Sequence, residues 1–409
     1  MASPKADKKA ADKAVPDRRE DLALMEPVKL AEGARQRGEL TDLALQLARG
    51  SAAFRSRLPD PVAGSLATLV RAMNCYYSNL IEGHDTHPVD IERALKNDYS
   101  QCREKRNLQL EAKAHINVQR WIDEGGLDAG TVITSDGIRE IHRRFCAELP
   151  AELLIISDPD TGEELEVVPG EFRERDVQVG RHVPVSPAAI PRFLTRFEEV
   201  FTGLGIAEML IATGAMHHRL AWIHPFLDGN GRVARLMSHA VLRETLDTGS
   251  IWSVSRGLAR SVEEYRRRLA ECDLPRRNDL DGRGNLSEEA LVEFTRYFLT
   301  TCIDQVAFME TLAQPERLRE RILQWTANET GKGRLLERSV KVMEALLYRG
   351  ELPRGELPSL LDVSDRQARR VVSSLMARDV IVSETTKTPL RLAFPATLAH
   401  EWLPGLFPE

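Results

Sequence analysis

The segment HPFLDGNGRVAR occupies residues 224–235 and carries the strongest local signal in the chain. Residues 209–222 before it are largely apolar with helical spacing, and apolar residues recur at that spacing again from Val233 onward. The proline and glycines at 225–231 interrupt the helical pattern. This order predicts a glycine-rich loop at a helix N-terminus, where free backbone N–H groups and the helix dipole favour an anion.

Four residues of this segment are suited to contact with phosphate. Gly229 and Gly231 let the backbone approach a ligand closely because they carry no Cβ atom. Arg232 and Arg235 are three residues apart, so they share one helix face and can bind further phosphate oxygens. We therefore expect a phosphorylated ligand at this loop.

Two more side chains add chemistry to the predicted anion site. Asp228 offers a hard oxygen ligand of the kind that Mg²⁺ accepts beside phosphates. His224 stands at the loop entrance and can accept a proton near pH 7. A histidine taken alone is usually a core residue, but these neighbours favour a base. The set predicts phosphoryl-type chemistry on a nucleotide, which depends on positioning and charge stabilisation.

At these residues the chain resembles the Fic-domain proteins, whose signature HxFx[D/E]GNGRxxR it matches at every fixed position. The resemblance implies a mainly helical fold, a bundle with a β-hairpin flap. It also implies transfer of AMP from ATP to a Ser, Thr or Tyr hydroxyl of a target protein, or of the chain itself, with pyrophosphate leaving. Removal of AMP, other transfers from phosphodiesters and a DNA-binding regulator remain open as alternatives.

The resemblance assigns a role to each matched residue. His224 would deprotonate the target hydroxyl, Asp228 would bind Mg²⁺, and Arg235 would contact the γ-phosphate of ATP. Phe226 would be a buried anchor. The residues implied to bind the phosphates are Gly229, Asn230, Gly231, Arg232 and Arg235.

A second pattern of the same family lies upstream, at Ser78-Asn79-Leu80-Ile81-Glu82-Gly83, which fits [S/T]xxxE[G/N]. Ser78 and Glu82 are four residues apart and share a helix face, and Gly83 is suited to end that helix. In the family this glutamate pairs with the last arginine of the signature, here Arg235, and takes the space of the γ-phosphate. We therefore predict an inhibitory helix at about 65–83.

A third feature is a run of short β-branched stretches with Gly and Pro turns at 153–185, which predicts one or two β-hairpins projecting from the helical bundle. Its later part resembles the family's flap, a hairpin over the active site whose free strand edge can pair with an extended target segment. We place this flap at about 165–185. Its predicted target-docking residues are Phe172, Arg173, Val177, Gln178 and Val179.

The remaining composition defines the predicted domains. Residues 1–20 are mixed charges with Ala and Pro and predict a disordered tail. An N-terminal helical region follows at 21–125 and the catalytic core at 126–326. The polar, glycine-rich stretch at 327–334 is typical of a linker.

Residues 334–409 are predicted to form a separate domain. Three amphipathic helices, the third N-capped by Ser364, precede two short strands, an order that resembles a winged helix-turn-helix. Arg366, Arg369 and Arg370 on the third helix could meet DNA phosphates. Basic and acidic side chains nearly balance in this domain, however, so we favour a protein contact or a homodimer over DNA.

Overall composition limits the class of protein. The 409 residues are 42% apolar with a formal net charge of -6, which argues against a bulk polycation built for nucleic acid. The sequence contains no long uninterrupted apolar run, so no membrane contact is expected. The five cysteines are widely spaced without CxxC, which favours a reducing, cytoplasmic location and buried thiols.

Overall fold

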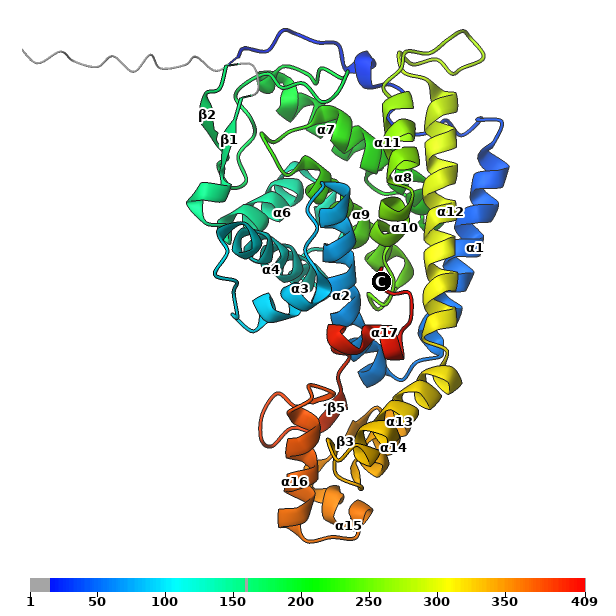
Figure 1. The fold of residues 1–409 in the computed structure, drawn as a ribbon. Helices are drawn as coiled ribbons and strands as arrows, with labels where there is room; N and C mark the ends of the chain where they lie inside the picture. Colours follow the sequence, from blue (N-terminus) through cyan, green and yellow to red (C-terminus); the bar gives the residue numbers. More distant parts are fainter. Residues whose placement is uncertain (1–14, 159–160, 409) are drawn as a thin grey trace, which may run out of the picture.

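The computed structural model describes residues 15–158 and 161–408 and is mainly helical, as predicted (Figure 1). The α-helices of the larger part of the molecule are α1 (Arg37–Ser56), α2 (Asp60–Ile81), α3 (Pro88–Leu95), α4 (Arg103–Asp123), α5 (Ala129–Val132), α6 (Ser135–Ala147), α7 (Ile190–Phe201), α8 (Ile206–Ile223), α9 (Asn230–Leu246), α10 (Val254–Arg260), α11 (Val262–Glu271) and α12 (Glu288–Leu312). Short 3-10 helices occur at Leu22–Met25, Ala151–Leu153 and Pro187–Ala189.

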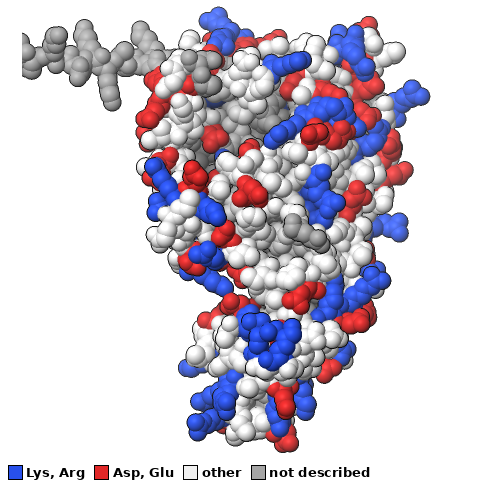
Figure 2. Space-filling model, in the orientation of Figure 1, with Lys and Arg blue, Asp and Glu red and all other residues white. Residues whose placement is uncertain are grey.

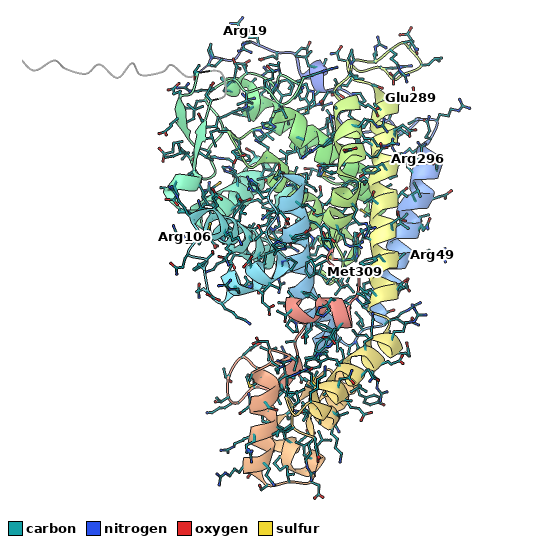
Figure 3. The ribbon with its side chains drawn as sticks, in the orientation of Figure 1. Arg19, Arg49, Arg106, Glu289, Arg296 and Met309 are labelled. Atoms are coloured by element: carbon teal, nitrogen blue, oxygen red, sulfur yellow. The ribbon has the colours of Figure 1, made fainter. Side chains whose placement is uncertain are left out.

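Helices α8 and α9 lie in the interior of this part and pack against each other. From Leu210 to Ile223, α8 is buried on nearly every face, which is why its sequence is apolar all round. Helices α1 and α12 pack side by side next to α8. Arg296 lies on α12 (Figure 3). Its guanidinium donates to both carboxylate oxygens of Glu39 on α1, at 2.6 and 2.9 Å. The turn between α8 and α9 therefore connects two helices that are packed tightly against each other.

The strands of this part form a hairpin within the range 153–185, as predicted, and it precedes the predicted flap. Strands β1 (Ile155–Ser157) and β2 (Glu164–Glu166) pair antiparallel. The predicted flap at 165–185 is instead an irregular loop with a single bridge, between Val179 and His182. The β-branched stretches on either side of the first turn pair with each other, and the proline and glycine that follow β2 end the ladder.

The predicted disordered tail covers residues 1–20, of which 1–14 lie outside the described residues. For residues 15–20 the prediction is wrong, because they lie against the larger part of the molecule. The carboxylate of Glu20 accepts hydrogen bonds from the backbone N–H and the hydroxyl of Ser186, at 2.7 and 2.8 Å. Polar contacts hold residues 15–20 in place. The prediction of disorder considered only how little apolar surface these residues can bury, so it did not include such contacts.

The predicted linker at 327–334 is largely helical. Helix α13 (Pro315–Gly331) runs through most of it. Glu329 within it is buried, and its carboxylate accepts hydrogen bonds from Arg334 and Arg378, each at 2.6 Å. These charge-assisted hydrogen bonds hold the end of α13 against the domain that follows.

That smaller domain lies at the lower end of the molecule in Figure 1. Its elements are α14 (Ser339–Arg349), β3 (Glu351–Leu352), a 3-10 helix (Arg354–Glu356), α15 (Leu357–Leu361), α16 (Asp365–Met376), β4 (Ile381–Val382) and β5 (Leu390–Leu392). The antiparallel strand order is β3-β5-β4, and Ser364 caps α16 as predicted. The assignment to the winged-helix class stays a prediction. Figure 2 shows both signs of charge interspersed over the visible face of the molecule.

After β5 the chain returns to the larger part of the molecule (Figure 1). A 3-10 helix (Ala396–Leu398) leads into α17 (Ala399–Trp402), and the side chains of Trp402, Leu403 and Leu406 are buried. The hydroxyl of Tyr77 on α2 donates to the carbonyl of Leu406 at 3.0 Å. The segment that follows the smaller domain is thus anchored on α2.

Within the described residues, no helix is both long and apolar enough for a transmembrane span. All five cysteines are free thiols. Cys75, Cys146, Cys272 and Cys302 are buried as predicted, whereas Cys102 is exposed at the start of α4.

Candidate active site

The turn between α8 and α9 adopts a compact loop that leaves the start of α9 open. His224 ends α8 in the left-handed region at φ 50°, and Gly229 precedes α9 at φ 82°. The side chain of Asn230 closes the loop, because its Oδ1 accepts from the N–H of Phe226 at 2.9 Å and its Nδ2 donates to the Phe226 carbonyl at 2.8 Å. The N-cap residue Gly229 gives α9 no side-chain hydrogen bond, so the first N–H groups of α9 favour an anion.

The two hydrogen bonds between Asn230 and Phe226 determine which atoms of Asn230 can reach a phosphate. Asn230 was predicted to bind phosphate, and both amide atoms of its side chain bond to the backbone of Phe226, which is fully buried as predicted. Asn230 can therefore offer its backbone N–H to a phosphate, while its side chain shapes the loop.

His224 has the protonation state that a general base needs. Its Nδ1 lies 3.3 Å from the carbonyl oxygen of Ala221, an acceptor, so the proton belongs on Nδ1 and the lone pair on Nε2. Burial lowers the pKa of His224 to about 4. At pH 7 the ring is neutral, and Nε2 can accept a proton.

Arg232 is held by two carboxylates. Its guanidinium donates to Glu111 on α4 through Nη1 and to Asp228 through Nη2, the latter at 3.3 Å. The guanidinium also lies over the ring of Phe145, 4.8 Å from the centroid. The Asp228 side chain remains half-exposed, so it can still offer oxygen to a cation.

Arg235 joins the loop to α2, as predicted from the upstream pattern. Its Nε donates to the Ser78 hydroxyl at 2.8 Å, and its Nη2 donates to the Ser78 carbonyl at 3.2 Å and to the Glu82 carboxylate. Burial disfavours the charged carboxylate, but the Arg235 guanidinium holds the pKa of Glu82 below its usual value. Gly83 follows at φ 89°, a conformation that favours glycine directly after the helix end.

The site contains two residues that no sequence pattern indicated, Glu111 and His84. The Glu111 carboxylate accepts a hydrogen bond from His84 at 3.1 Å as well as from Arg232. Burial opposes its ionisation, but these two partners hold the pKa of Glu111 below its usual value, and in turn Glu111 raises the pKa of His84. Glu111 lies in the middle of α4, far from the signature, and no local pattern indicates its partner.

The predicted target-docking residues divide into two groups. Phe172 is partly buried, with its ring 5.9 Å from that of Phe226. Val177 is half-buried, and Gln178 and Val179 are exposed, so these two positions are accessible to a partner. Arg173 forms the other group, because its side chain is buried.

Arg173 is only 4% exposed and bonds to backbone. It donates to the carbonyls of His224 at 2.8 Å, Arg175 at 2.9 Å and Val185 at 2.5 Å. Its side chain therefore fixes the loop to the end of α8. A groove of about 440 Å³ lies beside this loop, lined by β2, residues 171–175 and Leu227.

Comparison with known proteins places this geometry in a family. Residues 132–242 match the Fic/DOC family. A protein named protein adenylyltransferase Fic from Drosophila erecta is 35% identical over 112 residues, covering 27% of this chain and 20% of that protein. Its namesake from Nematostella vectensis is 28% identical over 198 residues, covering 46% of this chain and 42% of that protein.

Among solved structures, a Fic family protein from Desulfovibrio desulfuricans has a TM-score of 0.50 at 16% identity, over 86% of this chain and 96% of that chain. This likeness concerns the fold. The chain spans only a fifth of the Drosophila relative and less than half of the Nematostella relative. The family match covers α6 through most of α9, including the complete loop described above. The chain therefore contains a Fic domain of the Fic/DOC family.

Proposed function

We propose that this protein transfers AMP from ATP to a hydroxyl side chain of a target protein, and that Glu82 restrains the reaction. The observation that carries the proposal is the position of the Glu82 carboxylate. It pairs with Arg235 directly over Gly231, at the uncapped start of α9, where a phosphate would otherwise find N–H groups and a guanidinium. An anionic side chain thus occupies the anion site of the loop.

The residues around the loop can carry out the chemical step. The target hydroxyl would attack the α-phosphorus of ATP while its proton moves to Nε2 of His224. A new phosphorus–oxygen bond forms, the bond to the pyrophosphate oxygen breaks, and pyrophosphate leaves. The N–H groups of Gly229, Asn230 and Gly231 and the guanidinium of Arg232 would stabilise the charge that develops on the phosphates.

The residues also fit the Mg²⁺ ion that the family implies. Asp228 offers a half-exposed carboxylate at the loop. The described part of the chain contains no cluster of three or more His, Cys, Asp or Glu side chains suited to hold a metal by themselves. A single carboxylate suits Mg²⁺ bound mainly through substrate phosphates and water. When bound, Mg²⁺ would neutralise phosphate charge, and Asp228 would hold it beside the loop.

The restraint follows from competition for Arg235. While its guanidinium is paired with Glu82, it cannot contact a γ-phosphate, and ATP is left in a pose that does not align the α-phosphate for attack. The names of the Drosophila and Nematostella relatives support an adenylyltransferase activity. The exposed positions Gln178 and Val179 remain our proposed contacts for the target.

The decisive experiment compares the intact masses of the wild-type and Glu82→Gly proteins after incubation with ATP and Mg²⁺. We expect the variant to gain AMP on itself or on an added target, and wild type to gain little. Glu82→Gly combined with His224→Ala is the control and should gain none. If Glu82→Gly transfers no AMP but wild type releases AMP from a modified target, the alternative of AMP removal would replace the proposal.

A further inference from the structure

His142, on the inner face of α6, contacts both parts of the site and was not singled out by any sequence pattern. Its side chain is fully buried. The imidazole stacks on the ring of Phe226, with centroids 3.9 Å apart and planes 3° from parallel. Its two ring nitrogens bond to two different segments, the signature loop and the loop that follows β2.

The partners of His142 define its tautomer. The backbone N–H of Gly170 points at Nδ1 at 2.9 Å, and because an N–H can only donate, Nδ1 must carry the lone pair. The proton of the neutral ring therefore lies on Nε2, which is 3.2 Å from the carbonyl oxygen of Asp228 and donates to it. Burial lowers the pKa of His142 to about 4, so the ring remains neutral at pH 7.

The bond to Asp228 has a consequence for the anion site. The carbonyl of Asp228 and the N–H of Gly229 belong to one planar trans peptide and point in opposite directions. A carbonyl directed at α6 therefore turns the N–H of Gly229 away from α6. The backbone fits closely there, since a Cβ on Gly229 would lie 3.5 Å from the His142 ring.

The bond to Gly170 fixes the start of the loop at 170–182 in the same way. Arg139, one helical turn before His142, donates through Nε to the Gly170 carbonyl at 2.8 Å. Its guanidinium also lies over the ring of Phe172, 5.2 Å from the centroid. Both backbone groups of Gly170 are thus held by α6, at a φ of 78° and within contact of Arg143.

From these contacts we propose that His142 is a positioning residue with two roles. Its Nε2 orients the Asp228–Gly229 peptide for binding phosphate, and its Nδ1 anchors the loop at 170–182, which carries the proposed target contacts. The inference rests on the proposed function for the identity of the two ligands. It extends that function, because the single side chain of His142 would align both the nucleotide and the target hydroxyl. No atom of His142 needs to touch either substrate.

Three variants separate the two hydrogen bonds. His142→Phe keeps an aromatic ring against Phe226 and removes both bonds. His142→Gln can place an amide N–H near the position of Nε2, and His142→Asn can place a carbonyl oxygen near Nδ1. His218→Phe is the matched control, because His218 is also a buried histidine with two ring hydrogen bonds, to Asp273 and Arg219, outside the loop.

Two measurements apply to all four proteins and do not require transfer activity. Calorimetry gives the affinity for AMP and ATP, and hydrogen exchange gives the protection of the Gly170 amide. We expect His142→Phe to weaken both nucleotides about tenfold, the scale of one hydrogen bond, and to lose Gly170 protection. His142→Gln should recover the affinity alone, and His142→Asn the protection alone.

The comparison of His142→Phe with wild type and with His218→Phe separates a positioning role of His142 from a packing role. If His142→Phe binds nucleotide as wild type does, or loses no more affinity than His218→Phe, His142 serves only packing. In the wild-type protein, ¹⁵N shifts of the ring should report a proton on Nε2, and a proton on Nδ1 would overturn the proposal without any variant. An inactive Glu82→Gly protein with the expected affinities would refute the proposed function and leave the role of His142 standing.

Discussion

A Cβ atom on Gly231 would lie 2.5 Å from Oε1 of Glu82, closer than real Cβ contacts allow. Any larger residue at this position would push the end of the Glu82 side chain aside. The loop and α2 are far apart in the sequence, and their surfaces meet at this point with the Arg235–Glu82 pair beside it. The restraint proposed for Glu82 would therefore depend on the shape of the loop.

This relationship predicts coupling between the two positions. Gly231→Ala should be less favourable in the wild type than a glycine-to-alanine change in a helix normally is, because the methyl group pushes the end of the Glu82 side chain away from Arg235. In the Glu82→Gly background the same substitution should cost less, since the clashing atom is gone. Chemical denaturation of the four proteins of this double-mutant cycle measures the difference. Equal costs in both backgrounds would show that Glu82 does not occupy this position in solution.

His224→Ala tests the base. The side chain makes one weak hydrogen bond, so we expect folding to be retained. In the Glu82→Gly background, AMP transfer should fall roughly 10²- to 10⁴-fold, the range for a positioned general base. Because burial lowers the pKa of His224 to about 4, the rate in the Glu82→Gly protein should change little between pH 8 and pH 6. A drop centred near pH 6.5 would indicate a solvated imidazole.

Arg235→Ala, in the same background, tests the phosphate assignment. Only ATP carries the γ-phosphate that Arg235 is proposed to contact, so ATP should lose more affinity than AMP. Titration calorimetry with both nucleotides measures the two losses. Arg243→Ala, on the same helix but bonded to the carbonyl of Asp123, is the matched control and should leave both affinities unchanged. Equal losses for AMP and ATP in Arg235→Ala would place Arg235 elsewhere.

The part of the site that sequence could predict is the part with local signals. The Pro and Gly break between two helical stretches predicted the loop, and the four-residue spacing of Ser78 and Glu82 put both on the helix face that meets Arg235. Glu111 could not be predicted, because its pairing with Arg232 arises only when α4 packs near α9. Buried ion pairs between distant segments leave no periodicity in the chain.

The errors in the fold have a similar origin. Arg173 was placed among the docking residues because its segment resembles the flap, and nothing in the sequence indicates that its side chain is buried. Three backbone carbonyl acceptors, of which those of Val185 and His224 are farther along the chain, make its burial favourable. Of the one or two hairpins predicted at 153–185, the first is present as β1 and β2. The later segment has only the bridge between Val179 and His182, because β-branched residues occur on both sides of Gly170 and only the geometry of the backbone decides which stretch pairs.

His115 provides a test of how burial sets the pH dependence of stability. It lies fully buried on α4, and neither ring nitrogen has a hydrogen-bond partner among the described residues. Burial lowers its pKa to about 3, and the nearby guanidinium groups of Arg235 and Arg232 act in the same direction. In the unfolded chain the pKa returns to about 6.5.

Between these two pKa values the unfolded state binds one more proton at His115 than the folded state does. The folded protein should therefore lose stability as the pH falls from about 6.5 towards 3, by roughly 1.4 kcal/mol per pH unit for this histidine alone. His115→Leu removes the group that binds this proton in the unfolded state, and it replaces an unpartnered polar ring by an apolar side chain. We expect its unfolding free energy to fall less steeply than that of wild type between pH 6 and pH 4, and to be similar at pH 7. Parallel urea titrations at several pH values give both slopes. Identical slopes would mean that His115 titrates normally in the folded state, with water reaching its ring.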